Sequence, residues 1–188
     1  IDKGIAAKNE QWHTFTRMHI KQLENNEPVV ETDIQNLNAF NLAHADLNTV
    51  IFNKANAILE ENKLPVIIGG EHSSPLGLIQ ALAKKHTSFG VLQIDAHADL
   101  RESYEGFIYS HASIMHHVIK LKSVEKLVQV GIRDICPDEV KIIEQSDNRI
   151  QIFYDEKMKR HLFEGDRWEN ICKEIIEKLP HKVYISFD

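Results

Sequence analysis

One short apolar segment and the polar residues that follow it constrain this chain most. The run Phe89–Ile94 is rich in apolar residues and leads directly into Asp95-Ala96-His97-Ala98-Asp99. Such a run predicts a buried strand. Residues two apart in an extended segment project from one side, so Asp95, His97 and Asp99 can converge on one point. Carboxylate and imidazole groups bind divalent metals, which indicates a metal site for water activation. A strand that simply ends in a polar turn is the alternative.

Two further candidate ligands stand at similar places relative to predicted strands. Val66–Ile68 leads through a glycine turn to His72, before a helical pattern for which Ser74 is the expected N-cap. Lys182–Phe187 alternates as a strand does, and Asp188 follows it. A lone loop histidine is more often only hydrogen-bonded, and an aspartate after a strand is a common turn former. Their shared position after strands favours a role as metal ligands, because binding sites in parallel sheets lie at the carboxyl ends of the strands.

Strand-like and helix-like runs alternate along the chain. Strands are expected near 65–68, 89–95, 126–132, 150–154 and 182–187. Helices are expected near 33–62, 75–85, 112–121, 137–146 and 167–179. Residues 157–161 are expected to form a solvated basic loop. This alternation predicts a parallel sheet covered by helices. A chain of 188 residues, 43% of them hydrophobic, can bury one sizeable core. We therefore expect a single domain over residues 1–188.

Several segments together resemble a known family, the ureohydrolases, which include arginase, agmatinase, formiminoglutamase and guanidinobutyrase. The matching segments are Gly69–Ser73, Asp95–Asp99, Tyr109–Ser113, Val130–Arg133 and Ile185–Asp188. Their order and spacing cover nearly the whole chain from about Pro65 onward. The loop over residues 99–106 and the segment after it are most similar to agmatinase-type members.

The resemblance implies an α/β fold, a three-layer α/β/α sandwich with a central parallel sheet whose C-terminal strands are missing from this chain. It also implies two Mn²⁺ ions per subunit, bridged by carboxylates and a water-derived hydroxide. By correspondence with the family, Asp95 and Asp188 are the bridging carboxylates, His72 and Asp99 complete one manganese site, and His97 serves the other. The next family ligand would fall beyond Asp188, so we expect a fragment of a longer protein.

The implied reaction is hydrolysis of a guanidino compound, with agmatine giving putrescine and urea as the favoured case. In the family, the hydroxide attacks the guanidinium carbon, and His111 corresponds to a histidine near the leaving amine, which indicates proton transfer. A capping or solvated role for His111 is the alternative. Arg101, Glu102 and Tyr104 are candidates for contact with the far end of the substrate. Glu71 stands where many members have aspartate, which we expect to alter hydrogen bonding behind the ligands.

Other functions compete with agmatine hydrolysis. Arginase, guanidinobutyrase or formiminoglutamase activity would use the same centre on a related substrate. A metallophosphoesterase would present a downstream Gly-Asn-His segment, which the sequence lacks. A zinc deacetylase would use one metal and fewer carboxylates, so the metal count separates it from the two-metal prediction. A non-catalytic relative, or a truncated chain that acts only as an oligomer subunit, is the last alternative.

Charge and composition bear on partners and location. The formal net charge of −6 argues against nucleic acid and is compatible with a cationic small-molecule substrate. Two cysteines make no disulfide framework, which favours a reducing, cytoplasmic compartment. We see no signal peptide and no apolar stretch long enough to cross a membrane. The family resemblance further implies a homo-oligomer, a trimer or hexamer, and a place in polyamine biosynthesis.

Overall fold

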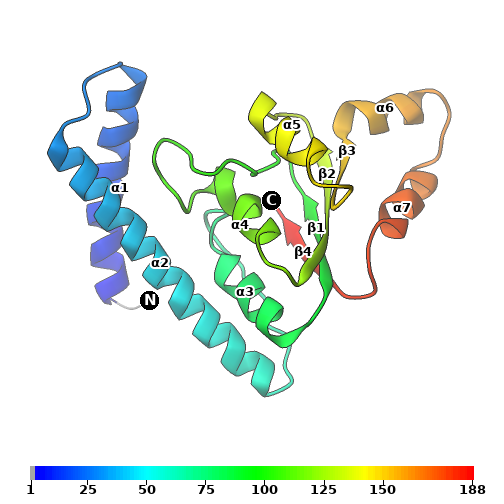
Figure 1. Ribbon diagram of the computed structural model, residues 1–188, viewed down its shortest axis with the longest axis horizontal. Helices are drawn as coiled ribbons and strands as arrows, with labels where there is room; N and C mark the ends of the chain where they lie inside the picture. The colour runs from blue at the N-terminus through cyan, green and yellow to red at the C-terminus, as the bar shows by residue number, and fades with distance from the viewer. Residues whose placement is uncertain (1–2) are drawn as a thin grey trace.

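The computed structural model describes residues 3–188 as helices packed around one parallel sheet (Figure 1). The helices are α1 (Lys3–Glu24), α2 (Glu31–Glu60), α3 (Leu76–Lys85), α4 (Ile114–Ile119), α5 (Pro137–Glu144), α6 (Asp155–Phe163) and α7 (Trp168–Glu177), with a 3₁₀ turn at His111–Ser113. The strands are β1 (Phe89–Ile94), β2 (Val124–Ile132), β3 (Ile150–Tyr154) and β4 (Val183–Phe187). None of the helices in this part of the chain is long and apolar enough to cross a membrane.

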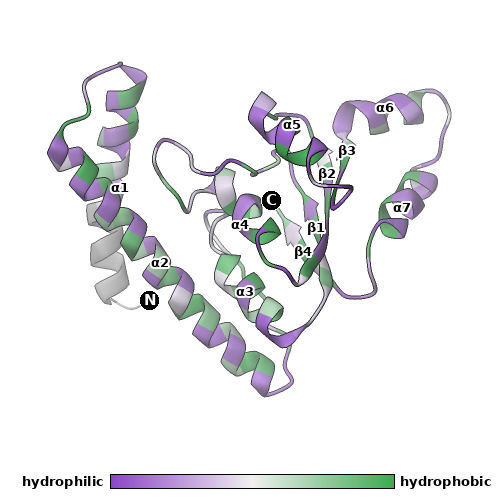
Figure 2. Ribbon diagram, viewed as in Figure 1, coloured by the Kyte–Doolittle hydropathy of each residue, from purple (hydrophilic) through white to green (hydrophobic). Residues whose placement is uncertain are grey.

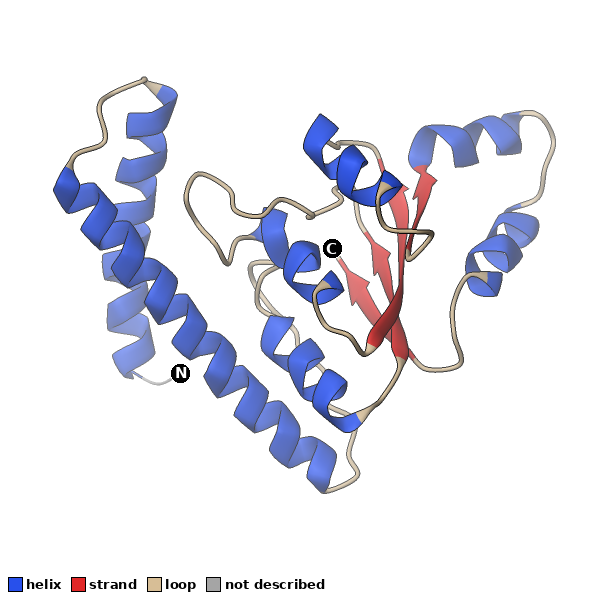
Figure 3. Ribbon diagram, in the orientation of Figure 1, coloured by secondary structure: helices blue, strands red, loops and turns tan. Residues whose placement is uncertain are grey.

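The sheet has the order β3-β2-β1-β4, and every neighbouring pair is parallel. Helices α3, α4 and α5 lie on one side of it, and α6 and α7 lie on the other (Figure 3). This arrangement confirms the predicted three-layer α/β/α fold with a central parallel sheet. It also places β1 between β2 and β4, so the residues after β1 have strand ends on both sides.

Alternating side chains of the strands build a separate core on each face of the sheet. On one face, the core with α3 and α4 includes Phe89, Val91 and Leu127. On the other face, the core with α6 and α7 includes Val128 and Val130. The long helix α2, which alternates hydrophobic and hydrophilic residues along its length (Figure 2), adds a third cluster where it packs on α3. The two faces of the sheet are therefore both covered, as a parallel sheet requires.

Contact between α2 and α3 depends on a glycine. A Cβ atom at Gly77 would lie 2.4 Å from the carbonyl oxygen of Asn48 and 2.8 Å from the backbone nitrogen of Phe52. We expect Gly77→Ala to lower the free energy of unfolding by about 1–3 kcal/mol, since the added methyl group overpacks this contact despite alanine's better helix propensity. In urea denaturation, Gly77→Ala should unfold at a lower midpoint concentration than the wild-type protein. Gly70→Ala should keep the wild-type midpoint, because a Cβ atom at Gly70 has no other atom within 4 Å. An unchanged midpoint for Gly77→Ala would contradict the close helix contact.

Three local predictions were wrong. The strand expected at 65–68 is an extended coil, with Ile68 97% exposed, and no strand within residues 3–188 lies beside it to complete a ladder. The basic loop expected at 157–161 belongs to α6, because Met158 packs against the sheet and Lys159 pairs with Asp155 one turn earlier. Ser74 does not cap α3, since its hydroxyl donates to the carbonyl oxygen of Glu71.

Candidate metal centre

Two carboxylates of the candidate centre follow adjacent strands at the carboxyl edge of the sheet. Asp95 comes directly after β1, and Asp188 comes directly after β4. The backbone N–H of Asp188 donates to the carbonyl oxygen of Ile94 at 3.0 Å, and that of Asp95 donates to the carbonyl oxygen of Val130 at 3.0 Å. The ladders thus continue to the ends of the strands. The parallel register therefore brings Asp95 and Asp188 side by side.

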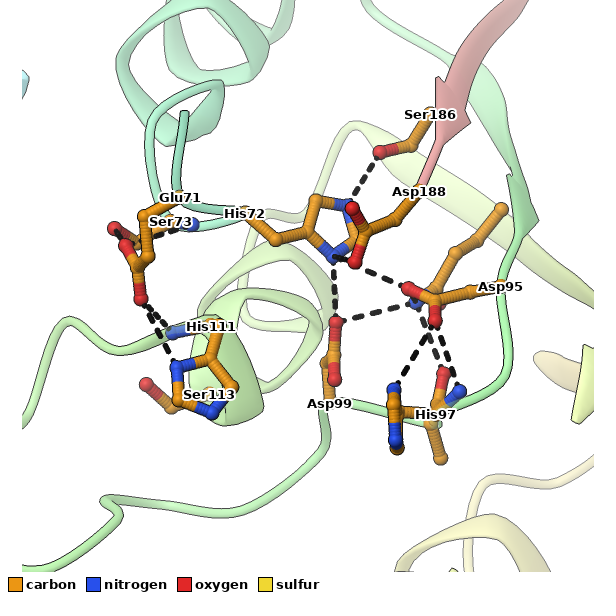
Figure 4. A network of polar contacts seen from close by, with 12 residues as sticks. Glu71, His72, Ser73, Asp95, His97, Asp99, His111, Ser113, Ser186 and Asp188 are labelled. Carbon is orange, nitrogen blue, oxygen red and sulfur yellow. Dashed lines mark hydrogen bonds and ion pairs between the residues drawn. The ribbon is translucent and has the colours of Figure 1, made fainter. Parts of the chain in front are cut away.

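His72 reaches the same point from the loop before α3 (Figure 4). Its Nδ1 atom lies 2.7 Å from Oδ2 of Asp99, 3.2 Å from Oδ2 of Asp95 and 3.8 Å from Oδ2 of Asp188. On the other side of the ring, Nε2 lies 2.8 Å from the hydroxyl oxygen of Ser186. A partner behind the imidazole fixes the orientation of the ring, as is usual for metal-binding histidines.

The electrostatics of the cluster are those of a cation site. Burial disfavours a charged His72, but hydrogen bonds to Asp95 and Asp99 outweigh it and raise the pKa of His72 to about 10. Burial also opposes a charged Asp95, yet hydrogen bonds from His72, the His97 backbone and Gln93 lower its pKa to about 2. Burial, together with the nearby charge of Asp95, raises the pKa of Asp99. Oxygens of three carboxylates therefore lie within 3.8 Å of Nδ1 of His72, and this concentration of negative charge suits a cation.

The donor atoms fit a divalent metal. One ligand atom each from His72, Asp95 and Asp188 lie within 4.8 Å of one another. The two oxygens of Asp95 face different neighbours, because Oδ2 faces His72 while Oδ1 lies 3.5 Å from Nδ1 of His97. A carboxylate placed between two imidazoles can bridge two ions. Hard oxygen donors with a few imidazoles suit Mn²⁺, as well as neighbouring divalent ions.

The remaining predicted ligands lie beside this group. Asp99 contacts His72 and adopts a left-handed backbone conformation, with φ of 54°. The His97 side chain is 57% exposed, and its Nε2 lies 3.9 Å from Oδ2 of Asp134. A cavity of about 300 Å³ opens over Asp95 and is lined by His97, Arg133 and Asp188 among others. His97 is therefore accessible to solvent at the mouth of the centre.

His111 and the candidate substrate loop form a neighbouring group. Oε1 of Glu71 accepts hydrogen bonds from the backbone N–H of His111 and, at 3.2 Å, from its Nδ1. This bond raises the pKa of His111. The ring of Tyr104 lies 5.7 Å from the His111 ring, and the Arg101 guanidinium lies 5.1 Å from the Tyr104 ring. Glu102, the other residue predicted for this loop, is exposed on it.

Several polar residues behind the ligands were not predicted from the sequence. Ser186 supports His72, and two fully buried glutamines, Gln93 and Gln129, lie behind Asp95 and Asp99. Glu139 is buried as well and accepts the backbone N–H of Leu100 at 3.0 Å. The signal available in the sequence was a glutamine inside each of two apolar strands, where an amide has to find a partner.

Comparison with known proteins assigns the chain to a family. The model of the arginase family matches residues 5–188. The chain belongs to the arginase family. This confirms the resemblance to ureohydrolases drawn from the five sequence segments.

Individual relatives agree with the family assignment. An N(1)-aminopropylagmatine ureohydrolase from Synechocystis sp. is 31% identical over 131 residues, which are 69% of this arginase-family chain and 40% of the relative. An agmatinase from Bacillus cereus is 31% identical over 70% of the chain and 41% of its own length. The crystal structure of an arginase from Bacillus cereus superimposes with a TM-score of 0.62 at 26% identity, over 77% of this chain and 55% of the other. The chain thus spans well under half the length of these two curated relatives.

Proposed function

We propose that this chain forms the metal centre of a manganese-dependent ureohydrolase that hydrolyses agmatine to putrescine and urea. The observation that supports this proposal most is the cluster of His72, Asp95 and Asp188 at the carboxyl edge of the sheet in an arginase-family chain. As in the family, we expect a homo-oligomer, a trimer or hexamer, and we propose a cytoplasmic location because the chain has only two cysteines.

In this proposal each ligand has a distinct task. Asp95 and Asp188 would be shared by two Mn²⁺ ions, His72 and Asp99 would help to hold one ion, and His97 would help to hold the other. When bound, the metal pair supplies an acidified water molecule as the nucleophile for the guanidinium carbon. The buried carboxylates of Asp95 and Asp99 would provide negative charge for holding the ions.

His111 is the proposed proton donor to the leaving amine. Because its Nδ1 bonds to the Glu71 carboxylate, the Nε2 atom is left to face the substrate. The same bond favours the protonated ring. We propose that the Nε2 proton passes from His111 to the amine nitrogen as the carbon–nitrogen bond breaks. Tyr104, beside the His111 ring, would contact the aliphatic part of the substrate.

Agmatine is favoured by the loop after Asp99 and by relatives named agmatinase and aminopropylagmatine ureohydrolase. One observation supports a second candidate. The guanidinium group of Arg101 lies over Tyr104 on the same loop and remains partly exposed, with a side-chain exposure of 41%. Its Nε lies 4.0 Å from Oε2 of Glu139, and a substrate carboxylate would be a second anionic partner for its exposed part. Guanidinobutyrate or arginine, which carry one, are therefore the alternative substrates.

The test is urea release by the full-length, Mn²⁺-loaded protein from agmatine, arginine and guanidinobutyrate in parallel. We expect urea from agmatine, complete loss of release after treatment with a chelator, and recovery when Mn²⁺ is restored. Urea from only arginine or guanidinobutyrate would assign the site to a carboxylate-bearing substrate. No urea from any of them would contradict the proposed function.

A further inference from the structure

We propose that Gln93 and Gln129 form a buried amide relay that positions the carboxylates of the metal centre and thereby sets its affinity for divalent metal. This inference rests on the proposed function, because it assigns a task to residues behind the ligands. Both glutamines are 0% exposed. They are positioning residues and do not touch the substrate.

Gln93 contacts the metal-binding loop at three points. Its side-chain amide nitrogen donates to Oδ2 of Asp95 at 2.8 Å, to Oδ2 of Asp99 at 3.3 Å and to the carbonyl oxygen of His97 at 3.1 Å. The two N–H donors of this NH₂ group are therefore shared among two candidate ligands and the backbone carbonyl of a third. The two carboxylate oxygens it contacts are the ones that face Nδ1 of His72.

Gln129 holds Gln93 in this orientation. The two residues are partners in the β1–β2 register, so their side chains project from the same face of the sheet. The amide nitrogen of Gln129 donates to Oε1 of Gln93 at 2.5 Å and to the carbonyl oxygen of Ala98 at 2.6 Å. With its Oε1 occupied, Gln93 directs its NH₂ group to Asp95 and Asp99.

The chemistry of an amide suits this position. A neutral donor stabilises two adjacent carboxylates without adding a charge that would compete with a metal ion. The surrounding side chains on this face of the sheet, such as Val91, Leu127 and Leu100, are apolar and fully buried. Hydrogen bonds offset the cost of burying amides there, and they pair both amide nitrogens and Oε1 of Gln93, whereas Oε1 of Gln129 is buried without a hydrogen-bond partner. Residues behind metal ligands commonly change metal affinity by about 10–100-fold when they are replaced.

The experiment measures Mn²⁺ binding to the full-length protein by isothermal titration calorimetry, with thermal unfolding of the metal-free protein as the check on folding. We expect Gln93→Leu, which keeps the apolar volume but removes the donors, to bind Mn²⁺ about 10–100-fold more weakly. Gln93→His, which retains a ring N–H donor, should recover part of this loss. Gln129→Leu should lower the Mn²⁺ affinity less than Gln93→Leu does. Combined with Gln93→Leu, it should cause little further loss of affinity, because Gln129 acts through Gln93.

A strand glutamine outside the relay provides the matched control. Gln151 lies on β3 and donates to the carbonyl oxygen of Asn148, so Gln151→Leu should leave Mn²⁺ affinity unchanged. If the wild-type protein binds Mn²⁺ and Gln93→Leu binds it equally well, the relay is wrong. If the wild-type protein itself fails to bind Mn²⁺, the proposed function fails instead. If Gln93→Leu does not fold, the comparison of Gln129→Leu with Gln151→Leu decides, and equal affinities would overturn the relay.

Discussion

The Asp95→Asn variant is expected to lose both Mn²⁺ binding and urea release. Asparagine has the same shape, but it removes the negative charge that lies between His72 and His97. An amide also presents only one oxygen, so it could not offer a separate oxygen to each of two ions. Asp95 is itself a proposed ligand. The loss of metal affinity should therefore exceed the roughly 100-fold loss that follows substitution of residues behind the ligands. Calorimetric titration with Mn²⁺ and a urea assay measure the two effects.

An exposed aspartate serves as the control for this variant. Asp138 on α5 pairs with Lys141 at 2.8 Å, and both side chains are exposed. Asp138→Asn should therefore retain Mn²⁺ binding and activity. Full activity in Asp95→Asn would contradict the two-metal centre, because no other residue described here lies between the two histidines in the same way.

The His111→Ala variant is expected to lower kcat by about 10²–10⁴-fold while Mn²⁺ affinity stays near the wild-type value. His111 bonds to Glu71, which is not a proposed ligand, so removing its ring takes away a proton donor and leaves the metal cluster in place. Steady-state kinetics with agmatine, together with calorimetric titration of Mn²⁺, separate the two quantities.

His181 offers a matched histidine for this comparison. It is exposed and precedes β4, at the end of that strand opposite Asp188. His181→Ala should leave kcat unchanged. If His111→Ala reduced kcat and Mn²⁺ affinity to the same extent, His111 would act through the metal centre and not as a proton donor.

Local sequence patterns determined much of the fold. The apolar runs before Asp95 and Asp188 predicted β1 and β4, and the helical pattern after Ser74 predicted α3. These elements follow from side-chain spacing, which depends on residues close together in the chain. The same spacing predicted that polar side chains stand at the ends of strands. The family assignment also followed from sequence, since its segments are short and specific.

The tertiary structure decided which of these elements are neighbours. The sheet order places β4 beside β1, and only this order sets Asp188 against Asp95. The contact between Glu71 and His111 and the pairing of Gln93 with Gln129 likewise join residues far apart in the chain. The segment 65–68 shows the reverse case, because its strand-like pattern has no adjacent strand in the described chain. Strand order, register and long-range hydrogen bonds arise from packing between distant segments. A local sequence pattern does not identify which distant segment a strand or helix will pack against.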